Sequence, residues 1–273
     1  MQRDSYSTYL PLLDGNPTDE AITNPSEWLS SLRSSTNISM DTIPECCVIS
    51  FFRHAGARLG EWYQDVKEQL WPDPMFRAIT FTAHGQRCGY LFPGYGAPIA
   101  SLLLEQLIAL GVRRFGVIGT AGTLRPELPY GSLLIPRWAI RDEGISYHYL
   151  PPSDVVQVTS SLSDRVLAVL RQRGLTVHEG GTWTTDAIYR ETRRKVEAFR
   201  ERGCASVEME LASLLAIAAF REIELAALFY LTDSVGGTRW DSRRDGKPDE
   251  LIREETSNLV TVVVEALAST EIS

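Results

Sequence analysis

The sequence lacks the features that mark several classes of protein. Its four cysteines form no C-x-x-C pair, and its four histidines have neither H-x-x-x-H nor H-E-x-x-H spacing. These absences predict free thiols and no metal site. No apolar run approaches the length of a membrane-spanning helix, and the N-terminus has no basic start followed by an apolar core. We therefore expect a cytoplasmic protein with no membrane partner.

Positive charge is also scarce. The chain has 27 Lys and Arg against 35 Asp and Glu, which gives a formal net charge of -8. Proteins that bind nucleic acid usually carry a basic surface, so we expect no nucleic-acid partner. In other respects the composition, with 44% apolar and 23% charged residues, is that of a globular protein.

The chain divides into two regions of different composition. Residues 1–44 are rich in Ser, Asn, Thr, Asp and Pro, which predicts a polar N-terminal arm with one short helix near Pro25. Residues 45–273 alternate apolar runs with segments of helical periodicity. This alternation predicts one α/β domain with a mostly buried sheet.

Strands and helices are expected at defined places in this domain. Strands are expected over 46–52, on both sides of a turn at His84-Gly85 within 76–94, and over 113–120, 132–140, 175–185 and 225–233. Helices are expected over 55–70, 99–110, 163–173, 188–203, 210–222 and 248–268.

Two glycine-containing turns are candidates for ligand binding. Gly94 and Gly96 lie between a strand and a helix, where backbone N–H groups can approach an anion, although a plain tight turn would also explain them. Thr120 and Gly122 end an apolar strand, and ligands of α/β proteins bind at such ends. An ordinary strand-to-loop turn is the simpler interpretation of this second pair.

Two acidic segments are further candidates. Glu208, Met209 and Glu210 open an apolar helix, where a glutamate can cap the helix or face the hydroxyls of a ligand. Asp233 ends a buried strand. It can cap the next turn or, where burial favours its protonated form, act as a general acid.

In this order and spacing, the four segments resemble the nucleoside phosphorylase superfamily, and most closely its uridine-phosphorylase-like members. The matching residues lie in 93–124, 139–151, 206–221 and 231–235. The resemblance implies a single domain with a mixed, barrel-like central sheet flanked by helices, in a three-layer sandwich. It also implies a homo-oligomer, either a dimer or a hexamer.

The resemblance implies a pentosyltransferase of nucleoside catabolism and salvage. Such an enzyme cleaves the N-glycosidic bond of a purine or pyrimidine nucleoside and releases the free base and a pentose 1-phosphate. Phosphate is the co-substrate, and no cofactor or metal is needed. Because the transition state resembles an oxocarbenium ion, the enzyme must hold the sugar, stabilise the departing base and present the nucleophile.

The resemblance also assigns roles to the candidate residues. Glu210 matches the carboxylate that accepts hydrogen bonds from the 2′- and 3′-hydroxyls, and Asp233 matches the acid near N7 in purine-specific members. The remaining nucleoside-binding candidates are Gly122 beside the base, Met209 beneath the sugar, and Glu208 in the same segment. The phosphate-binding candidates are Gly96, Thr120 and Arg53.

The chain departs from the family at the phosphate site. Phosphorylases generally place an arginine where this chain has Val117, and the loop after the first strand lacks the usual Gly-Asp-Pro motif. Arg53 and Arg141 are the candidates to replace this missing charge. A nucleoside hydrolase that uses water and a nucleoside-binding protein without turnover therefore stay open as alternatives. A third hypothesis, a nicotinamide-dependent oxidoreductase, is supported by Gly94 and Gly96 alone.

The identity of the base is open as well. Uridine-specific members bind uracil through a Gln-x-Arg pair, whereas this chain has TWTTDAIYRET at 182–192. Asp233 favours a purine, while the overall similarity favours uridine.

Overall fold

A computed structural model describes residues 10–33, 44–70, 76–243 and 248–269. Within these residues, a ten-stranded sheet forms the centre of the protein. Its strands are β1 (Cys46–Ser50), β2 (Gln64–Leu70), β3 (Arg77–Ala83), β4 (Gln86–Leu91), β5 (Arg114–Thr123), β6 (Leu133–Asp142), β7 (Val155–Gln157), β8 (Val177–Thr185), β9 (Cys204–Glu208) and β10 (Glu224–Ser234). The α-helices are α1 (Pro25–Arg33), α2 (Ala97–Ala109), α3 (Leu162–Gln172), α4 (Arg193–Glu201), α5 (Leu211–Arg221) and α6 (Asp249–Ala268). Short 3-10 helices are η1 (Pro11–Leu13), η3 (Ala55–Glu61), η4 (Ser146–His148) and η5 (Ile188–Arg190).

Part of the sheet closes on itself. The strands follow one another in the order β10-β6-β8-β9-β5, and β5 pairs again with β10, while β1, β4, β3 and β2 extend the sheet outward from β5. The β5–β10 and β6–β8 pairs are parallel, whereas β5 meets β9 in an antiparallel pair limited to the ends of both strands. The predicted mixed, barrel-like sheet in a single α/β domain is therefore confirmed.

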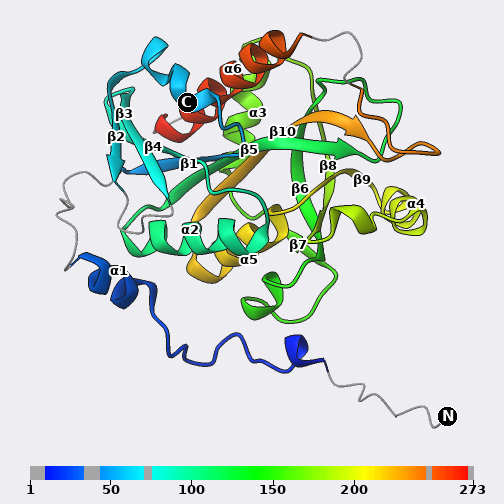
Figure 1. Cartoon of the computed structure of the whole chain (residues 1–273), viewed down its shortest axis with the longest axis horizontal. Coiled ribbons are helices and arrows are strands. Elements are labelled where there is room, and N and C mark those ends of the chain that lie inside the picture. Colours follow the sequence, from blue (N-terminus) through cyan, green and yellow to red (C-terminus); the bar gives the residue numbers. More distant parts are fainter. Residues whose placement is uncertain (1–9, 34–43, 71–75, 244–247, 270–273) are drawn as a thin grey trace.

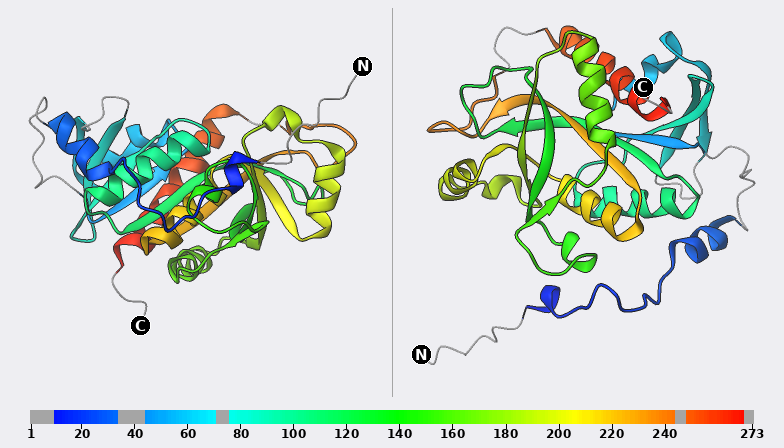
Figure 2. Two further views of the ribbon diagram at one scale, coloured as in Figure 1. Left: turned by 90° about the horizontal axis from the view of Figure 1, so that it is seen from below. Right: turned by 180° about the vertical axis from the view of Figure 1, so that it is seen from behind.

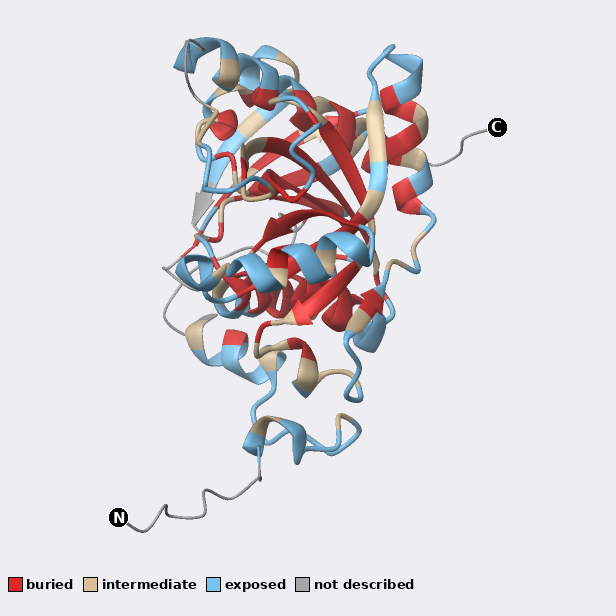
Figure 3. Cartoon of the chain, turned by 90° about the vertical axis from the view of Figure 1, so that its right-hand side faces the viewer, coloured by how far each residue is buried: buried red, intermediate tan, exposed pale blue. Residues whose placement is uncertain are grey.

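Helices cover both sides of this sheet (Figures 1 and 2). The pair α2 and α5 lies on one side, and the pair α3 and α6 lies on the other. Two large clusters of buried apolar residues fill the two sides, and a third, smaller cluster includes Trp183 with Phe199 of α4 packed against it. Figure 3 shows the buried strands at the centre and the exposed outer faces of the surrounding helices. This two-sided burial explains why the strands read as nearly continuous apolar runs.

The N-terminal residues 10–33 run along the outside of the domain (Figure 1). Their helix α1 contacts α2, where Leu29 is 2% exposed. Leu29, together with the contact of η1 with η4, thus attaches a mostly exposed segment to the domain.

Most of the predicted elements are confirmed, with boundaries shifted by a few residues. The helix expected over 55–70 is wrong, because this segment forms η3 and then the edge strand β2. The cause is tertiary: β2 pairs with β3 over Lys67–Leu70, and Gly56 packs so closely that a Cβ there would lie 2.9 Å from Ile79 Cδ1. Pairing with a neighbouring strand therefore overrides the helical spacing.

The helix expected over 188–203 begins late. Residues Ile188–Arg190 form η5, and α4 begins after Thr192, whose hydroxyl accepts a hydrogen bond from the backbone N–H of Lys195 at 3.4 Å. Threonine is a favoured residue at this capping position. Residues 186–191, with η5 among them, therefore connect β8 to α4.

Gly116 of β5 offers a test of how closely the sheet packs against α6. A Cβ at this position would lie 2.1 Å from Val263 Cγ1 and 3.2 Å from Leu267 Cδ1. We expect Gly116→Ala to lower the free energy of unfolding by about 1–3 kcal/mol, because an added methyl forces the helix outward. Denaturant unfolding measures the loss. Gly60→Ala, which meets no atom within 4 Å, is the control, and equal stability of the two variants would contradict the predicted clash.

Candidate active site

The predicted site residues follow strands that end at one edge of the sheet. β4, β1, β5 and β10 run parallel, so the segments after them emerge on the same side. β9 reaches this edge through its antiparallel pair with β5, in which Gly122 faces Val207. Ligands of α/β proteins bind at such an edge, and the closure of the sheet brings the β9–α5 junction to it.

Asp233 lies beside Gly122. A Cβ built at Gly122 would lie 3.3 Å from Asp233 Oδ2 and 3.2 Å from Val207 Cγ1. The absence of a side chain at Gly122 therefore allows the carboxylate to approach the backbone of β5. Any larger residue at this position would press on Asp233.

Glu210 joins two loops that are 114 residues apart in the sequence. The backbone N–H of Gly96 donates a hydrogen bond to Glu210 Oε1 at 2.5 Å, and the N–H of Met209 donates to Oε2 at 3.3 Å. Gly96 has a φ of 104°, a backbone conformation that favours glycine. The N–H of Gly96, which we predicted to bind phosphate, is therefore used here to hold Glu210.

The carboxylate of Glu208 is used within the protein. Its Oε2 accepts hydrogen bonds from the backbone N–H groups of Glu210 and Leu211, both at 2.7 Å, and its Oε1 accepts one from the Thr184 hydroxyl at 2.5 Å. These donors belong to the first turn of α5 and to β8. Such contacts are those of a helix cap, and they favour a positioning role over the predicted contact with the nucleoside.

Several carboxyl groups at this edge have raised pKa values, and burial is the largest cause for each of them. Burial raises the pKa of Glu210 above its ordinary value, and burial together with the charge of Glu210 raises that of Glu208. Burial and then the charge of Asp233 raise the pKa of Glu191 to about 7. Carboxyl groups whose pKa lies near neutrality are suited to proton transfer at physiological pH.

Two of the predicted phosphate-binding residues lie near the ends of neighbouring strands: Arg53 follows β1, and Thr120 belongs to β5. The last residue of β1, Ser50, pairs with Ile118 of β5, so Arg53 and Thr120 each follow this pair closely. Both residues are exposed, and the Arg53 guanidinium lies 4.9 Å from the centre of the Phe92 ring. Within the described part of the chain, Arg53 forms no ion pair. Its charge is thus available to an anion.

Neither Val117 nor Arg141 supplies a charge at this edge. Val117 is 1% exposed and belongs to the apolar core. The guanidinium of the buried Arg141 donates to the hydroxyls of Ser146 and Ser153, each at 2.8 Å, and to backbone carbonyls of the same loop. The hypothesis that Arg141 compensates for the missing arginine is therefore wrong, because its donors hold the loop that follows β6.

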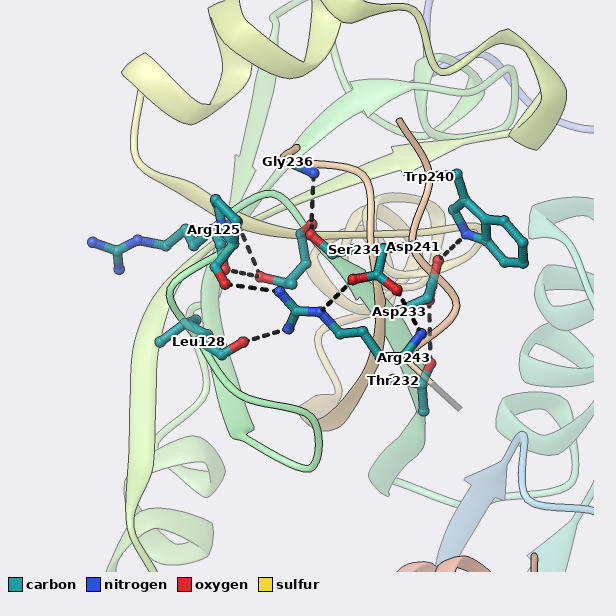
Figure 4. Close-up of polar contacts among 11 residues, drawn as sticks. Arg125, Leu128, Thr232, Asp233, Ser234, Gly236, Trp240, Asp241 and Arg243 are labelled. Atoms are coloured by element: carbon teal, nitrogen blue, oxygen red, sulfur yellow. Dashed lines mark hydrogen bonds and ion pairs between the residues drawn. The ribbon is translucent and has the colours of Figure 1, made fainter. Parts of the chain in front are cut away.

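Two residues at this edge were missed in the sequence. Glu191 is half-buried beside η5, and Trp240 donates its indole N–H to Asp233 Oδ2 at 2.8 Å (Figure 4). An isolated tryptophan in the polar stretch GGTRWDSRR was the available signal for Trp240. For Glu191 the sequence offered no signal, because its approach to Asp233 depends on the path of the loop after β8.

The described residues contain neither a cluster of metal-ligating side chains nor a helix suited to cross a membrane. No group of three or more His, Cys, Asp or Glu side chains that could hold a metal ion occurs among them. No helix in the described ranges is both long enough and apolar enough to cross a membrane.

Comparisons with known proteins agree on the family. The purine nucleoside phosphorylase DeoD-type of Streptococcus gordonii is 26% identical over 189 residues, which cover 68% of this chain and 80% of the relative. The protein of the same name from Streptococcus pneumoniae serotype 19F is 27% identical over 188 residues, with the same coverage. A crystal structure of purine nucleoside phosphorylase from Toxoplasma gondii in complex with immucillin-H shares the fold. Its TM-score is 0.71 at 18% identity, and the match covers 83% of this chain and 92% of that one. The family model of the phosphorylase superfamily matches residues 47–268, and because this range spans most of the chain, the protein belongs to the phosphorylase superfamily.

Proposed function

We propose that this protein is a purine nucleoside phosphorylase that converts a nucleoside and phosphate to the free base and a pentose 1-phosphate. The main support is the position of Asp233, whose carboxylate lies against Gly122 at the edge of the sheet that also carries Glu210. An acid at this place can protonate a purine leaving group at N7. A pyrimidine base has no N7, so an acid at this place favours a purine. The curated relatives named above are purine nucleoside phosphorylases.

Each residue at this edge has a distinct task in the proposed reaction. A phosphate oxygen attacks C1′, the bond between C1′ and the base nitrogen breaks, and its electron pair goes to the base. The Asp233 carboxyl then gives its proton to the base at N7, while the ionised form of Glu210 accepts hydrogen bonds from the ribose hydroxyls. Hydrogen bonds of this charged kind are each worth about 1.5–3 kcal/mol.

The phosphate would lie between Arg53 and Thr120. Arg53 supplies the positive charge, and the exposed hydroxyl of Thr120 can donate a hydrogen bond to a phosphate oxygen. Glu208 has a positioning role in this scheme, because it fixes the first turn of α5 on which Glu210 depends. Gly96 has the same kind of role from the β4–α2 loop.

A panel of adenosine, inosine, guanosine and uridine, tested with and without phosphate, checks this proposal. We expect release of a purine base only when phosphate is present, with pentose 1-phosphate as the second product. Base release that does not depend on phosphate would instead identify a hydrolase. Nucleoside binding without base release would identify a protein without turnover, and preference for uridine would contradict the proposed base.

Replacement of Arg53 tests whether this residue binds the phosphate. Arg53→Met keeps an apolar stem over Phe92 but removes the charge. Loss of one charge-assisted contact is expected to raise KM for phosphate by about 10–100-fold. KM for the nucleoside should change much less, and an unchanged KM for phosphate would remove Arg53 from the site.

A further inference from the structure

The segment after β10 folds into a small hairpin above the strand ends (Figure 4). The backbone N–H of Ser234 donates to the carbonyl of Asp241 at 2.8 Å, and the N–H of Asp241 donates back to Ser234 at 2.9 Å. This reciprocal pair closes the loop that carries Trp240. The indole of Trp240 is thereby held next to Asp233, with Nε1 2.8 Å from Asp233 Oδ2.

The hairpin is tied to the loop between β5 and β6. The guanidinium of Arg243 donates to the backbone carbonyls of Pro126, at 2.8 Å, and Leu128. Gly236 lies so close to this loop that a Cβ there would be 2.2 Å from the carbonyl oxygen of Leu124. On another side, Arg200 of α4 donates to the carbonyl of Gly236 at 3.0 Å. Contacts from two separate elements make this hairpin a fixed support for Trp240.

The hydrogen bond from Trp240 constrains the carboxyl group of Asp233. The indole N–H can only donate, so Asp233 Oδ2, at 2.8 Å, must act as the acceptor. The exchangeable proton of the acid is therefore placed on Oδ1, whose neighbour is the Thr232 hydroxyl at 3.2 Å. A hydroxyl can turn to accept or to donate, so Oδ1 is free to gain and to lose a proton.

The indole also has a free face. Trp240 is 66% exposed although its N–H is bonded inside the site. A base that accepts a proton from Asp233 must come within hydrogen-bond distance of that carboxyl, and hence within a few ångströms of the indole ring. Aromatic side chains bind heterocyclic bases by stacking, with little preference among bases.

We infer that Trp240 is a positioning residue for Asp233 and that its exposed ring stacks against the heterocyclic base of the substrate. This inference rests on the proposed function, since it concerns the acid of the same reaction. Trp240 then contributes to the reaction in two ways. The indole N–H selects the oxygen that carries the proton, and the ring contributes to binding of the base.

Two substitutions separate these parts. Trp240→Phe keeps an aromatic ring but removes the N–H, so kcat for a purine nucleoside should fall by about 10-fold or more while KM stays within a few-fold of its original value. Trp240→Ala removes both, so it should lower kcat similarly and also raise KM by about 10-fold. Trp28→Phe, on the half-exposed Trp28 of α1, is the control and should match the unaltered protein. Thermal unfolding should show the same Tm for all four proteins, because both tryptophans lie at the surface.

The outcomes distinguish the inference from the function on which it rests. If the unaltered protein releases a purine base but Trp240→Phe and Trp240→Ala match it in kcat and KM, the inference is wrong and the proposed function stands. Equal effects of the two variants on kcat and KM, accompanied by a lower Tm, would show a merely structural role and would also overturn it. If the unaltered protein neither binds nor cleaves a purine nucleoside, the proposed function fails, and the role of Trp240 fails with it.

Discussion

Replacement of Glu210 by glutamine is expected to lower kcat/KM for a purine nucleoside by about 100- to 10,000-fold. In the proposed reaction this carboxylate accepts two hydrogen bonds from ribose hydroxyls, each worth about 1.5–3 kcal/mol when the acceptor is charged. Glutamine keeps an oxygen for the N–H of Gly96 but cannot accept at both positions with a full negative charge. Steady-state kinetics with one purine nucleoside at saturating phosphate measures the loss.

The same substitution should make the protein more stable at alkaline pH. Burial raises the pKa of Glu210, so the folded protein holds the proton of this carboxyl more tightly than the unfolded chain does. The stability linked to this proton is fully present below the ordinary carboxyl pKa and is lost as pH rises through the folded-state pKa. Glutamine does not titrate, and we therefore expect the Tm of the variant to exceed that of the unaltered protein increasingly between about pH 5 and pH 8. Each kcal/mol relieved corresponds to about 2–4 °C.

Opposite effects on activity and stability identify a residue kept for function. Glu197→Gln, on an exposed position of α4, is the matched control and should change neither quantity. A Glu210→Gln variant that loses activity and stability together at pH 8 would instead mean that Glu210 is needed to hold the two loops. Full activity of this variant would remove the sugar-binding role altogether.

The sequence predicted the strands and helices well where burial is two-sided. The runs that became β1, β5 and β10 are covered on both faces by helices, so their apolar character follows directly from the fold. The prediction from sequence was wrong at 55–70. Part of this segment is an exposed edge strand with a mixed pattern, which forms because it pairs with β3. Local spacing cannot report a partner that lies elsewhere in the chain.

The site was predictable as a set of segments but not as a set of contacts. The position of Asp233 follows from the end of β10, which was predicted over 225–233. No strand was predicted over Cys204–Glu208, so the order of the motifs alone indicated the place of Glu210. The bond from Gly96 to Glu210 joins residues 114 positions apart, and no spacing rule predicts it. Arg141 is a similar case, because its cationic side chain suggested phosphate binding, whereas its guanidinium donates four hydrogen bonds within one loop. Polar side chains have several possible partners, and only tertiary structure decides among them.

Replacement of Asp233 by asparagine is expected to slow purine nucleoside cleavage by about 100- to 10,000-fold, which is the usual contribution of a general acid. Asparagine is nearly the same size, and its carbonyl oxygen can still accept the indole N–H of Trp240, so the site should keep its shape. What it lacks is a proton to give to the departing base. Single-turnover measurements of base release isolate this step from product release.

A nucleoside with a preactivated base gives the decisive comparison. In 7-methylguanosine the methyl group at N7 already makes the base cationic, so its departure needs no proton from the enzyme. Asp233→Asn should therefore cleave 7-methylguanosine at close to the rate of the unaltered protein while remaining slow with guanosine. An equal loss on both substrates would mean that Asp233 binds or orients the nucleoside and does not protonate it, because removal of an acid can slow only the substrate whose leaving group requires one.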